Sequence, residues 1–394
     1  MTWRERRVQE MAILINGFPF NSADFSDDDE LPLVRIRDIL GTSFETFVSP
    51  EVVPESAMVR DGDVVIGMDG DFNVVNWCRG PAALNQRLCL LRTTGSADAR
   101  FLAYALPAHL QVVNDLTYAT TVKHLSSSQV RGIRMTAPDL REQRAIADYL
   151  DHETARIDTL IEAQQRLIEM LRERRAAVLS TALTPGDGWL RRRIKHIGHT
   201  QLGKMLDGGR TVRPGDKLRP YVRAADVRAD GSVNLVDLKD MPFSDAELKA
   251  YDLRAGDVLL IEGGATVGRP GFMFESSPGV AFQKTVNRLR VGPVADARFV
   301  YWSMLLLYES NYYANHYGAV SFVHLTGEKL REIELDLPSV GEQRHIAMYL
   351  DEQTAKIDAL IAETERFIEL SRERRSALIT AAVTGQIDIQ EEVA

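Results

Sequence analysis

The chain has 394 residues, of which 45% are hydrophobic and 26% are charged, a composition typical of folded proteins with more than one core. Two cysteines exclude a disulfide framework, and a formal net charge of −9 excludes a uniformly basic nucleic-acid-binding chain. The apolar runs are too short to span a membrane. The first residues, MTWRERRVQE, lack the apolar stretch of a secretory signal, so we expect a cytoplasmic protein.

Residues 1–139 are predicted to form a first globular α/β domain. Short β-branched and apolar runs alternate with Gly, Asp and Pro, the pattern of strands joined by turns. Basic residues are sparse here, and the acidic run SDDDE from Ser26 is typical of a solvated face. Four sequence blocks mark the domain: GDVVIGMDG from Gly62, ALNQRLCLLR from Ala83, FLAYAL from Phe101 and VKHLSSSQV from Val122.

Residues 140–184 are predicted to form one long helix. Asp139 precedes Glu142 by three positions, as in a capping box, and Pro185-Gly186 ends the segment. At about 1.5 Å per residue the helix would be about 60 Å long, and its apolar stripe needs a partner along that length. The stripe predicted to lie in a helix interface consists of Ile146, Leu150, Ile157, Ile161 and Ile168.

Residues 185–338 are predicted to form a second globular domain. The four blocks return in the same order, as GDVLLIEGG from Gly256, AFQKTVNRLR from Ala281, FVYWSM from Phe299 and FVHLTGEKL from Phe322. This domain begins with a basic stretch, because Trp189 to Asp230 contains eleven Lys or Arg residues against four Asp residues. Local charge decides which face can approach phosphates, so this stretch is a candidate for DNA contact.

Residues 339–385 are predicted to form a second long helix, followed by a tail at 386–394. From Glu342 the sequence EQRHIAMYLDEQTAKIDALIAETERFIELSRERR repeats EQRAIADYLDHETARIDTLIEAQQRLIEMLRERR from Glu142. Its apolar stripe consists of Ile346, Leu350, Ile357, Ile361 and Ile368. Both copies end in RERR, which contains Arg174, Arg175, Arg374 and Arg375. These arginines are predicted either to form salt bridges across the helix pair or to contact a partner protein.

The order of these segments predicts an α+β protein with an internal pseudo-two-fold repeat. Two α/β domains are separated by two long antiparallel helices that pack like a coiled coil. Paired modules of this kind bind two half-sites on duplex DNA, with a separation fixed by the protein. The two domains differ in sequence, so an asymmetric bipartite target is expected.

The candidate DNA contacts lie in the block near the end of each domain and in the basic stretch of the second domain. The two histidines occupy matching positions in domains with different targets, which favours phosphate positioning or a structural role over base recognition. A solvated charged loop is the alternative for the basic stretch. The candidates are Lys123, His124, Ser126, Lys204, Arg210, Arg213, Lys217, Arg219 and His324.

No catalytic motif is found in the sequence. An Asn-Pro-Pro-aromatic methylation motif, a G-x-x-x-x-G-K-[ST] phosphate loop and metal-spaced His/Cys clusters are all missing. EGGATVGRPG from Glu262 lacks the Lys-Ser/Thr ending of a phosphate loop, so a turn after a strand explains it better. We therefore expect a protein that is not an enzyme and that binds neither a metal nor a cofactor itself.

The repeated helices, with PDLREQRAIADYLD and PSVGEQRHIAMYLD at their starts, resemble the DNA-specificity subunit of type I restriction-modification systems. The resemblance covers essentially the whole chain. It implies two target-recognition domains, two helical regions that act as spacer and docking platform, and a non-catalytic role. The implied partners are double-stranded DNA, two adenine-N6 methyltransferase subunits that carry S-adenosylmethionine, and, in the restricting complex, the restriction subunit.

Two other classes of protein compete with this interpretation. A coiled-coil scaffold whose globular domains bind proteins would explain the helices but not the basic stretch of the second domain. A fused enzyme with an unrecognised site would need catalytic motifs that are missing. Salt dependence separates the DNA-binding protein from the scaffold, since binding through phosphates weakens steeply with added salt.

Overall fold

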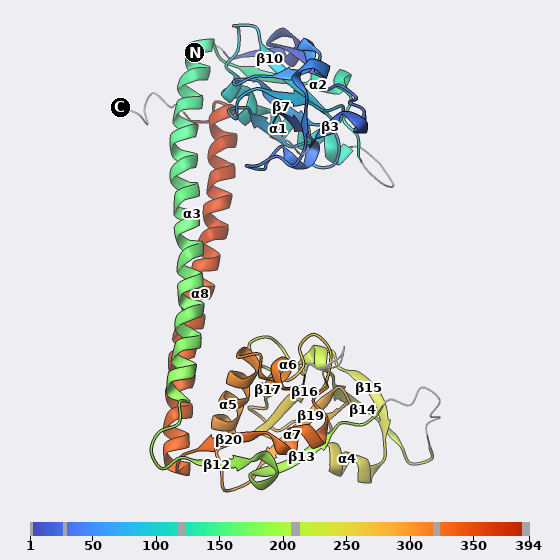
Figure 1. The fold of residues 1–394 in the computed structure, drawn as a ribbon, viewed down its shortest axis with the longest axis vertical. Coiled ribbons are helices and arrows are strands. Elements are labelled where there is room, and N and C mark those ends of the chain that lie inside the picture. Colours follow the sequence, from blue (N-terminus) through green and yellow to red (C-terminus); the bar gives the residue numbers. More distant parts are fainter. Residues whose placement is uncertain (1–2, 27–29, 117–122, 206–212, 318–323, 388–394) are drawn as a thin grey trace. The chain divides into compact units, whose positions relative to one another are not determined.

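The computed structural model describes residues 3–26, 30–116, 123–205, 213–317 and 324–387. The chain divides into two compact units, residues 1–165 with 365–394 and residues 166–364. Each unit consists of one globular part and of one half of each long helix (Figure 1). The expected α+β class with an internal repeat is confirmed. No described helix is long and apolar enough to cross a membrane.

The globular part of the first unit is built on two sheets. The four-stranded sheet is antiparallel and has the order β2 (Ala12–Asn16), β10 (Leu88–Thr93), β7 (Val64–Gly67), β8 (Val74–Asn76). The five-stranded sheet has the order β3 (Phe25–Ser26), β5 (Phe47–Val48), β4 (Leu31–Val34), β9 (Ala82–Leu84), β6 (Met58–Val59). The start and end of this part pair with each other through β1 (Arg4–Arg7) and β11 (Arg134–Ala137). The helices are α1 (Ala99–Leu116) and α2 (Ser127–Gly132).

The second unit repeats this plan. Its four-stranded antiparallel sheet has the order β13 (Gly198–Leu202), β19 (Val286–Val291), β16 (Asp257–Ile261), β17 (Pro270–Phe272). A second sheet contains β15 (Lys239–Phe243), β14 (Lys217–Val222) and β18 (Ala281–Phe282). The start and end pair again, as β12 (Leu190–Arg193) and β20 (Glu334–Leu337). The helices are α4 (Asp245–Tyr251), α5 (Ala297–Glu309), α6 (Tyr312–Tyr317) and α7 (Gly327–Glu332).

The two long helices are α3 (Leu140–Ala182) and α8 (Val340–Val383), which lie within the segments expected from the sequence. Most of the predicted stripe is buried, and Ile161, Ile346 and Ile361 are half-buried. From Thr154 to Val178 the buried and half-buried positions of α3 recur alternately after three and four residues, which is the period of a coiled-coil seam. Ile146 lies beside this seam and instead joins the hydrophobic core of the first globular part.

The last arginine of each RERR motif forms a salt bridge between the two long helices. In the second unit, Arg175 Nε lies 3.0 Å from an Asp358 carboxylate oxygen. In the first unit, Arg375 Nε lies at the same distance from an Asp158 oxygen. Arg174 and Arg374 are exposed. Of the two roles predicted for these motifs, salt bridging across the pair therefore applies to Arg175 and Arg375.

A buried glutamine explains why the EQR sequence is repeated. The Gln143 side-chain oxygen accepts a hydrogen bond from the Asp98 backbone N–H at 2.9 Å, and its NH₂ group donates to the Pro138 carbonyl at 2.9 Å. Gln343 makes the same two bonds, to Asp296 at 2.8 Å and to Pro338 at 2.8 Å. Since a buried amide must be satisfied, this pair of bonds fixes each long helix to the shorter helix of its globular part.

The two cysteines should differ in reactivity. Cys89 is buried in β10, and burial raises the pKa of its thiol to about 12, whereas Cys78 is exposed. Because the thiolate is the reactive form, we expect iodoacetamide at pH 8 to modify Cys78 only in the native chain and both residues in denaturant. Peptide mass mapping measures this. Equal native modification of both residues would contradict the burial of Cys89.

Candidate nucleic-acid interface

His124 of the first unit is held by a carboxylate and remains largely exposed. It pairs with Asp69 in an isolated β-bridge that follows β7, and its Nδ1 lies 2.6 Å from Asp69 Oδ1. The other oxygen of Asp69 lies 3.3 Å from Arg87 Nη1. The His124 side chain is 57% exposed and that of Arg87 is 58% exposed. Asp69 therefore positions two exposed groups that can donate hydrogen bonds to an anion.

His324 occupies the matching place in the second unit. The backbone N–H of Leu325 donates to the Glu262 carbonyl at 2.7 Å, as that of Leu125 donates to Met68 in the first unit. His324 Nδ1 lies 3.2 Å from Glu262 Oε2, and Lys329 Nζ donates to the His324 carbonyl at 3.0 Å. The carboxylate that holds the histidine thus comes from a different sequence position in each unit, Asp69 in the first and Glu262 in the second. Both units present an exposed imidazole.

Lys123 and Ser126 are used structurally. Lys123 Nζ donates to the Asn114 carbonyl near the end of α1 at 2.7 Å. Ser126 is the N-cap of α2, where its side chain and that of Gln129 form a capping box. These bonds account for both residues without DNA.

The basic stretch of the second unit contains one clear correction to the predicted contacts. Lys204 is 6% exposed, lies 2.9 Å from a Glu247 oxygen, and donates to the Pro242 carbonyl at 2.5 Å. A phosphate would have to replace both partners of a buried ammonium group, which is costly. Lys204 therefore stabilises the fold.

The remaining candidates of this stretch differ in accessibility. Lys217 Nζ pairs with Asp245 at 3.0 Å on the surface, and Arg213 is exposed. Arg219 is half-buried, and its Nε is buried without a hydrogen-bond partner among the described residues. Arg210 lies outside the described residues. Arg213 and Lys217 are thus the accessible cations at the start of β14.

Acidic residues distant in sequence neutralise much of the positive charge predicted for residues 189–230. Arg191 makes two hydrogen bonds to Asp336, at 3.0 and 3.1 Å, across the β12–β20 pair. Arg193 and Lys195 both pair with Glu332, at 3.0 and 2.7 Å. A count along the sequence misses these partners because they lie more than a hundred residues away. The surface around residues 189–230 is therefore less basic than the count within this stretch suggests.

The candidates named from the sequence do not include Arg87 and Lys284, which lie in two exposed turns that join the second sheet of each unit to its four-stranded sheet. In the first unit the turn contains Gln86 and Arg87, and in the second unit it contains Lys284. A glycine packs against each turn, since a Cβ atom on Gly17 would lie 1.9 Å from the Asn85 carbonyl oxygen, and one on Gly203 would lie 2.1 Å from that of Gln283. The repeated NQR and FQK blocks were the available signal.

The second unit also has a cavity of about 620 Å³, which is lined by residues of β13 and by residues at and next to α7, among them His199, Gln201 and Arg331. Figure 1 shows α7 next to β13 in this unit. Exposed donors from several elements, rather than one continuous basic patch, therefore form the candidate interface.

The two units share one framework and present different exposed groups. The described residues contain no cluster of His, Cys, Asp and Glu placed to hold a metal ion.

The family model described as the type I restriction modification DNA specificity domain matches residues 1–170 and 186–369. The chain belongs to this family, whose members provide DNA specificity.

Two specificity subunits of type I restriction enzymes are similar to the chain. The chain is 28% identical to the type I restriction enzyme EcoBI specificity subunit of Escherichia coli, over 99% of this chain and 87% of that protein. It is 26% identical to the EcoKI specificity subunit of E. coli strain K12, over 65% of this chain and 60% of that protein.

Two solved structures share the fold. One chain, from work on complex assembly and conformational transition of the type I R-M system, matches with a TM-score of 0.77, 16% identity and 98% coverage of both chains. The HsdS subunit from Thermoanaerobacter tengcongensis matches with a TM-score of 0.60 and 17% identity, over 98% of this chain and 97% of that one.

Proposed function

We propose that the chain is the specificity subunit of a type I restriction-modification complex, in which each globular domain binds one half of an asymmetric bipartite DNA target. The observation that carries the proposal is the repetition of one framework with different exposed groups. Gln143 and Gln343 make identical bonds, whereas Arg87 and Lys284 present different cations on matching turns. Because the two units share one framework, we expect both to bind DNA in the same orientation. Because their exposed side chains differ, we expect them to bind different half-sites.

Phosphate contacts are proposed for the exposed donors. His124, Arg87, His324, Lys284 and Arg213 are all accessible and come from turns and strand ends. Such groups fix the position of a protein on duplex DNA, while base recognition needs side chains that reach a groove. The chain itself is proposed to have no catalytic role and to bind no cofactor, with S-adenosylmethionine bound by its methyltransferase partner.

The long helices are proposed to dock two methyltransferase subunits, and a restriction subunit joins through the assembled complex. Both helices expose apolar residues at positions that match between the repeats: Leu160 with Leu360, Leu167 with Phe367, and Met170 with Leu370. Exposed apolar residues that recur beside a buried seam are typical of a protein interface rather than of a solvated helix face. Their repetition supports one methyltransferase subunit for each repeat.

The turn lysine provides a test of phosphate contact. In the complex with methyltransferase, Lys284→Ala is expected to weaken binding to any DNA duplex about three- to tenfold. It should also reduce the slope of log K against log salt concentration by about one, because one phosphate contact is lost. Fluorescence titrations at several salt concentrations measure both quantities. Lys356→Ala, which removes an exposed lysine paired with Glu352 on α8, is the control and should bind DNA normally.

The scaffold alternative makes the opposite prediction. If the globular domains bind proteins rather than DNA, the wild-type complex and both lysine variants should show the same weak affinity at every salt concentration. That result would remove the support for phosphate contacts.

A further inference from the structure

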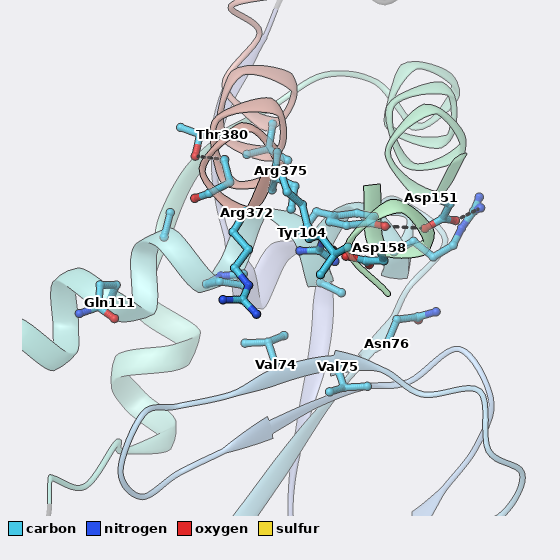
Figure 2. A pocket seen from close by; sticks show the side chains of 18 residues that line it. Val74, Val75, Asn76, Tyr104, Gln111, Asp151, Asp158, Arg372, Arg375 and Thr380 are labelled. Atoms are coloured by element: carbon cyan, nitrogen blue, oxygen red, sulfur yellow. Dashed lines mark hydrogen bonds and ion pairs between the residues drawn. The ribbon is translucent and has the colours of Figure 1, made fainter. Parts of the chain in front are cut away.

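The first unit contains a cavity of about 870 Å³ where α1 and β8 meet the two long helices (Figure 2). A volume of this size is within the range of ligand-binding pockets. Its lining combines apolar groups such as Val74 and Ile379 with several charged side chains. The cavity is distinct from the exposed turns and histidines of the candidate DNA interface.

Most of the charged groups on its wall are paired. Arg100 pairs with Asp148 and Asp151, both at 2.8 Å, and Tyr104 Oη donates to the Asp151 carboxylate at 2.8 Å. Arg375 pairs with Asp158 at 3.0 Å. Arg372 has no ion-pair partner among the described residues, and Figure 2 shows its guanidinium group extending into the cavity towards β8.

One further polar atom in the wall lacks a partner. The side-chain oxygen of Asn76 is buried and accepts no hydrogen bond from the part of the chain that the structure describes. Asn76 lies at the end of β8, opposite Val64 in the sheet register, and it lines the cavity. A buried acceptor without a donor is uncommon in a folded protein.

The second unit has larger side chains at the matching positions. Phe272 lies opposite Val258 as Asn76 lies opposite Val64, so Phe272 is the counterpart of Asn76. The matching N-terminal turns of α1 and α5 make Tyr301 the counterpart of Ala103 and Glu309 that of Gln111. Three small or uncharged residues in the first unit thus replace two aromatic residues and one acid.

In the second unit these three side chains complete the arginine contacts. The Tyr301 and Phe272 rings pack edge to face at 5.7 Å, and the Arg298 guanidinium lies 4.4 Å from the Tyr301 ring centroid. A Glu309 oxygen lies 3.1 Å from Arg175 Nη1. The first unit keeps the corresponding arginines, Arg100 and Arg375, but has Asn76, Ala103 and Gln111 in place of the two rings and the acid.

We propose that a methyltransferase subunit inserts an aromatic side chain and a neighbouring carboxylate into this cavity, the ring against Arg100 and the carboxylate against Arg372 and Arg375. This inference rests on the proposed docking function. The second unit provides the internal template for both contacts, and the charge of the unpaired Arg372 complements a carboxylate.

The test transfers the residues of the second unit into the first. In the full chain, Asn76→Phe/Ala103→Tyr/Gln111→Glu fills the cavity, so we expect the melting temperature to rise by about 2–4 °C. The same change should weaken the binding of the methyltransferase subunit at least about tenfold, because an aromatic anchor is lost. Calorimetry measures the first quantity, and titration with purified methyltransferase subunit measures the second.

A second variant tests the proposed charge contact without filling the cavity. Arg372→Glu changes an exposed side chain without filling space, so it should leave the melting temperature unchanged and weaken binding of the methyltransferase subunit at least about tenfold. Arg144→Glu, a charge reversal at an exposed position of α3 away from the cavity, is the matched control and should bind normally.

The possible results separate the inference from the proposed function. Normal binding by both the triple variant and Arg372→Glu would overturn the inference while leaving the specificity role intact. Failure of the wild-type chain to bind the methyltransferase subunit would overturn both. Binding of 3-(4-hydroxyphenyl)propionate to the free wild-type chain, with methyltransferase binding unchanged in the variants, would show a small-molecule site and overturn docking by a partner protein.

Discussion

Asp257→Ala is expected to lower the free energy of unfolding of the second unit by about 3–5 kcal/mol, because it leaves the half-buried Arg290 without the carboxylate that accepts two of its hydrogen bonds. Asp257 is fully buried and accepts two hydrogen bonds from Arg290, both at 2.7 Å. The hydrogen bond with Asp257 raises the pKa of Arg290, while burial lowers that of the neighbouring Arg288. Asp252 alone would then face both guanidinium groups.

Urea denaturation of the full chain measures this loss. Asp245→Ala removes the exposed partner of Lys217 and is the control, since a surface ion pair contributes little to stability. If Asp257→Ala unfolded at the same urea concentration as the control, the buried ion pair would not stabilise the unit. Arg92 and Asp63 form the same pair in the first unit, with hydrogen bonds of 2.8 and 2.6 Å, so the effect should recur there.

Gly203→Ala is expected to destabilise the second unit by about 1–3 kcal/mol, as forced overpacking does, and to displace the turn that presents Lys284. The added Cβ atom would lie 2.1 Å from the Gln283 carbonyl oxygen, and this oxygen belongs to the backbone and cannot turn aside. The Gly203 N–H also donates to the Val286 carbonyl at 3.0 Å, which holds the two segments together.

A second glycine-to-alanine variant is the control, because it shows the effect of alanine at a position without a close backbone contact. Gly341 lies in the first turn of α8, and a Cβ atom there would have no heavy atom within 4 Å. Gly341→Ala should therefore leave the melting temperature unchanged or raise it slightly, because alanine favours helix over glycine. Equal melting temperatures for Gly203→Ala and Gly341→Ala would show that the close approach of Gly203 to the Gln283 carbonyl does not affect stability.

The helices and the internal repeat could be predicted because they depend on local patterns. A stripe with a period near 3.5 residues determines a helix and its buried side, and Leu150, Ile157 and Ile168 are buried as that pattern requires. The capping residues placed the helix ends to within two residues of α3 and α8. The repeated blocks located the matching strands without any structural information.

The candidate site was harder to predict because it depends on contacts between distant segments. The partners of Arg191 and Lys204 lie on β20 and α4, so their charges are neutralised in a way that no window of sequence reveals. Lys204 resembles an accessible cation in the sequence and is buried in the structure. Conversely, Arg87 and Lys284 became candidates only when the strands placed their turns beside the histidine blocks.

The cavity of the first unit illustrates the same limit. Ala103 and Gln111 are ordinary residues of an amphipathic helix in the sequence. Only the sheet register and the matching helix starts identify them as the counterparts of Tyr301 and Glu309. The internal repeat then serves as a control within one molecule, since one copy shows the contacts that the other lacks.

Each globular domain is proposed to determine one half of a bipartite DNA target. The most direct measurement is methylome sequencing of cells that express the chain with its methyltransferase subunit, beside cells that lack the chain and cells in which residues 1–139 come from a different member of the family. An asymmetric two-part adenine-methylated motif that requires the chain, with one half alone changed by the exchange, is the predicted result. A motif that persists without the chain, or in which the exchange changes both halves, would contradict it.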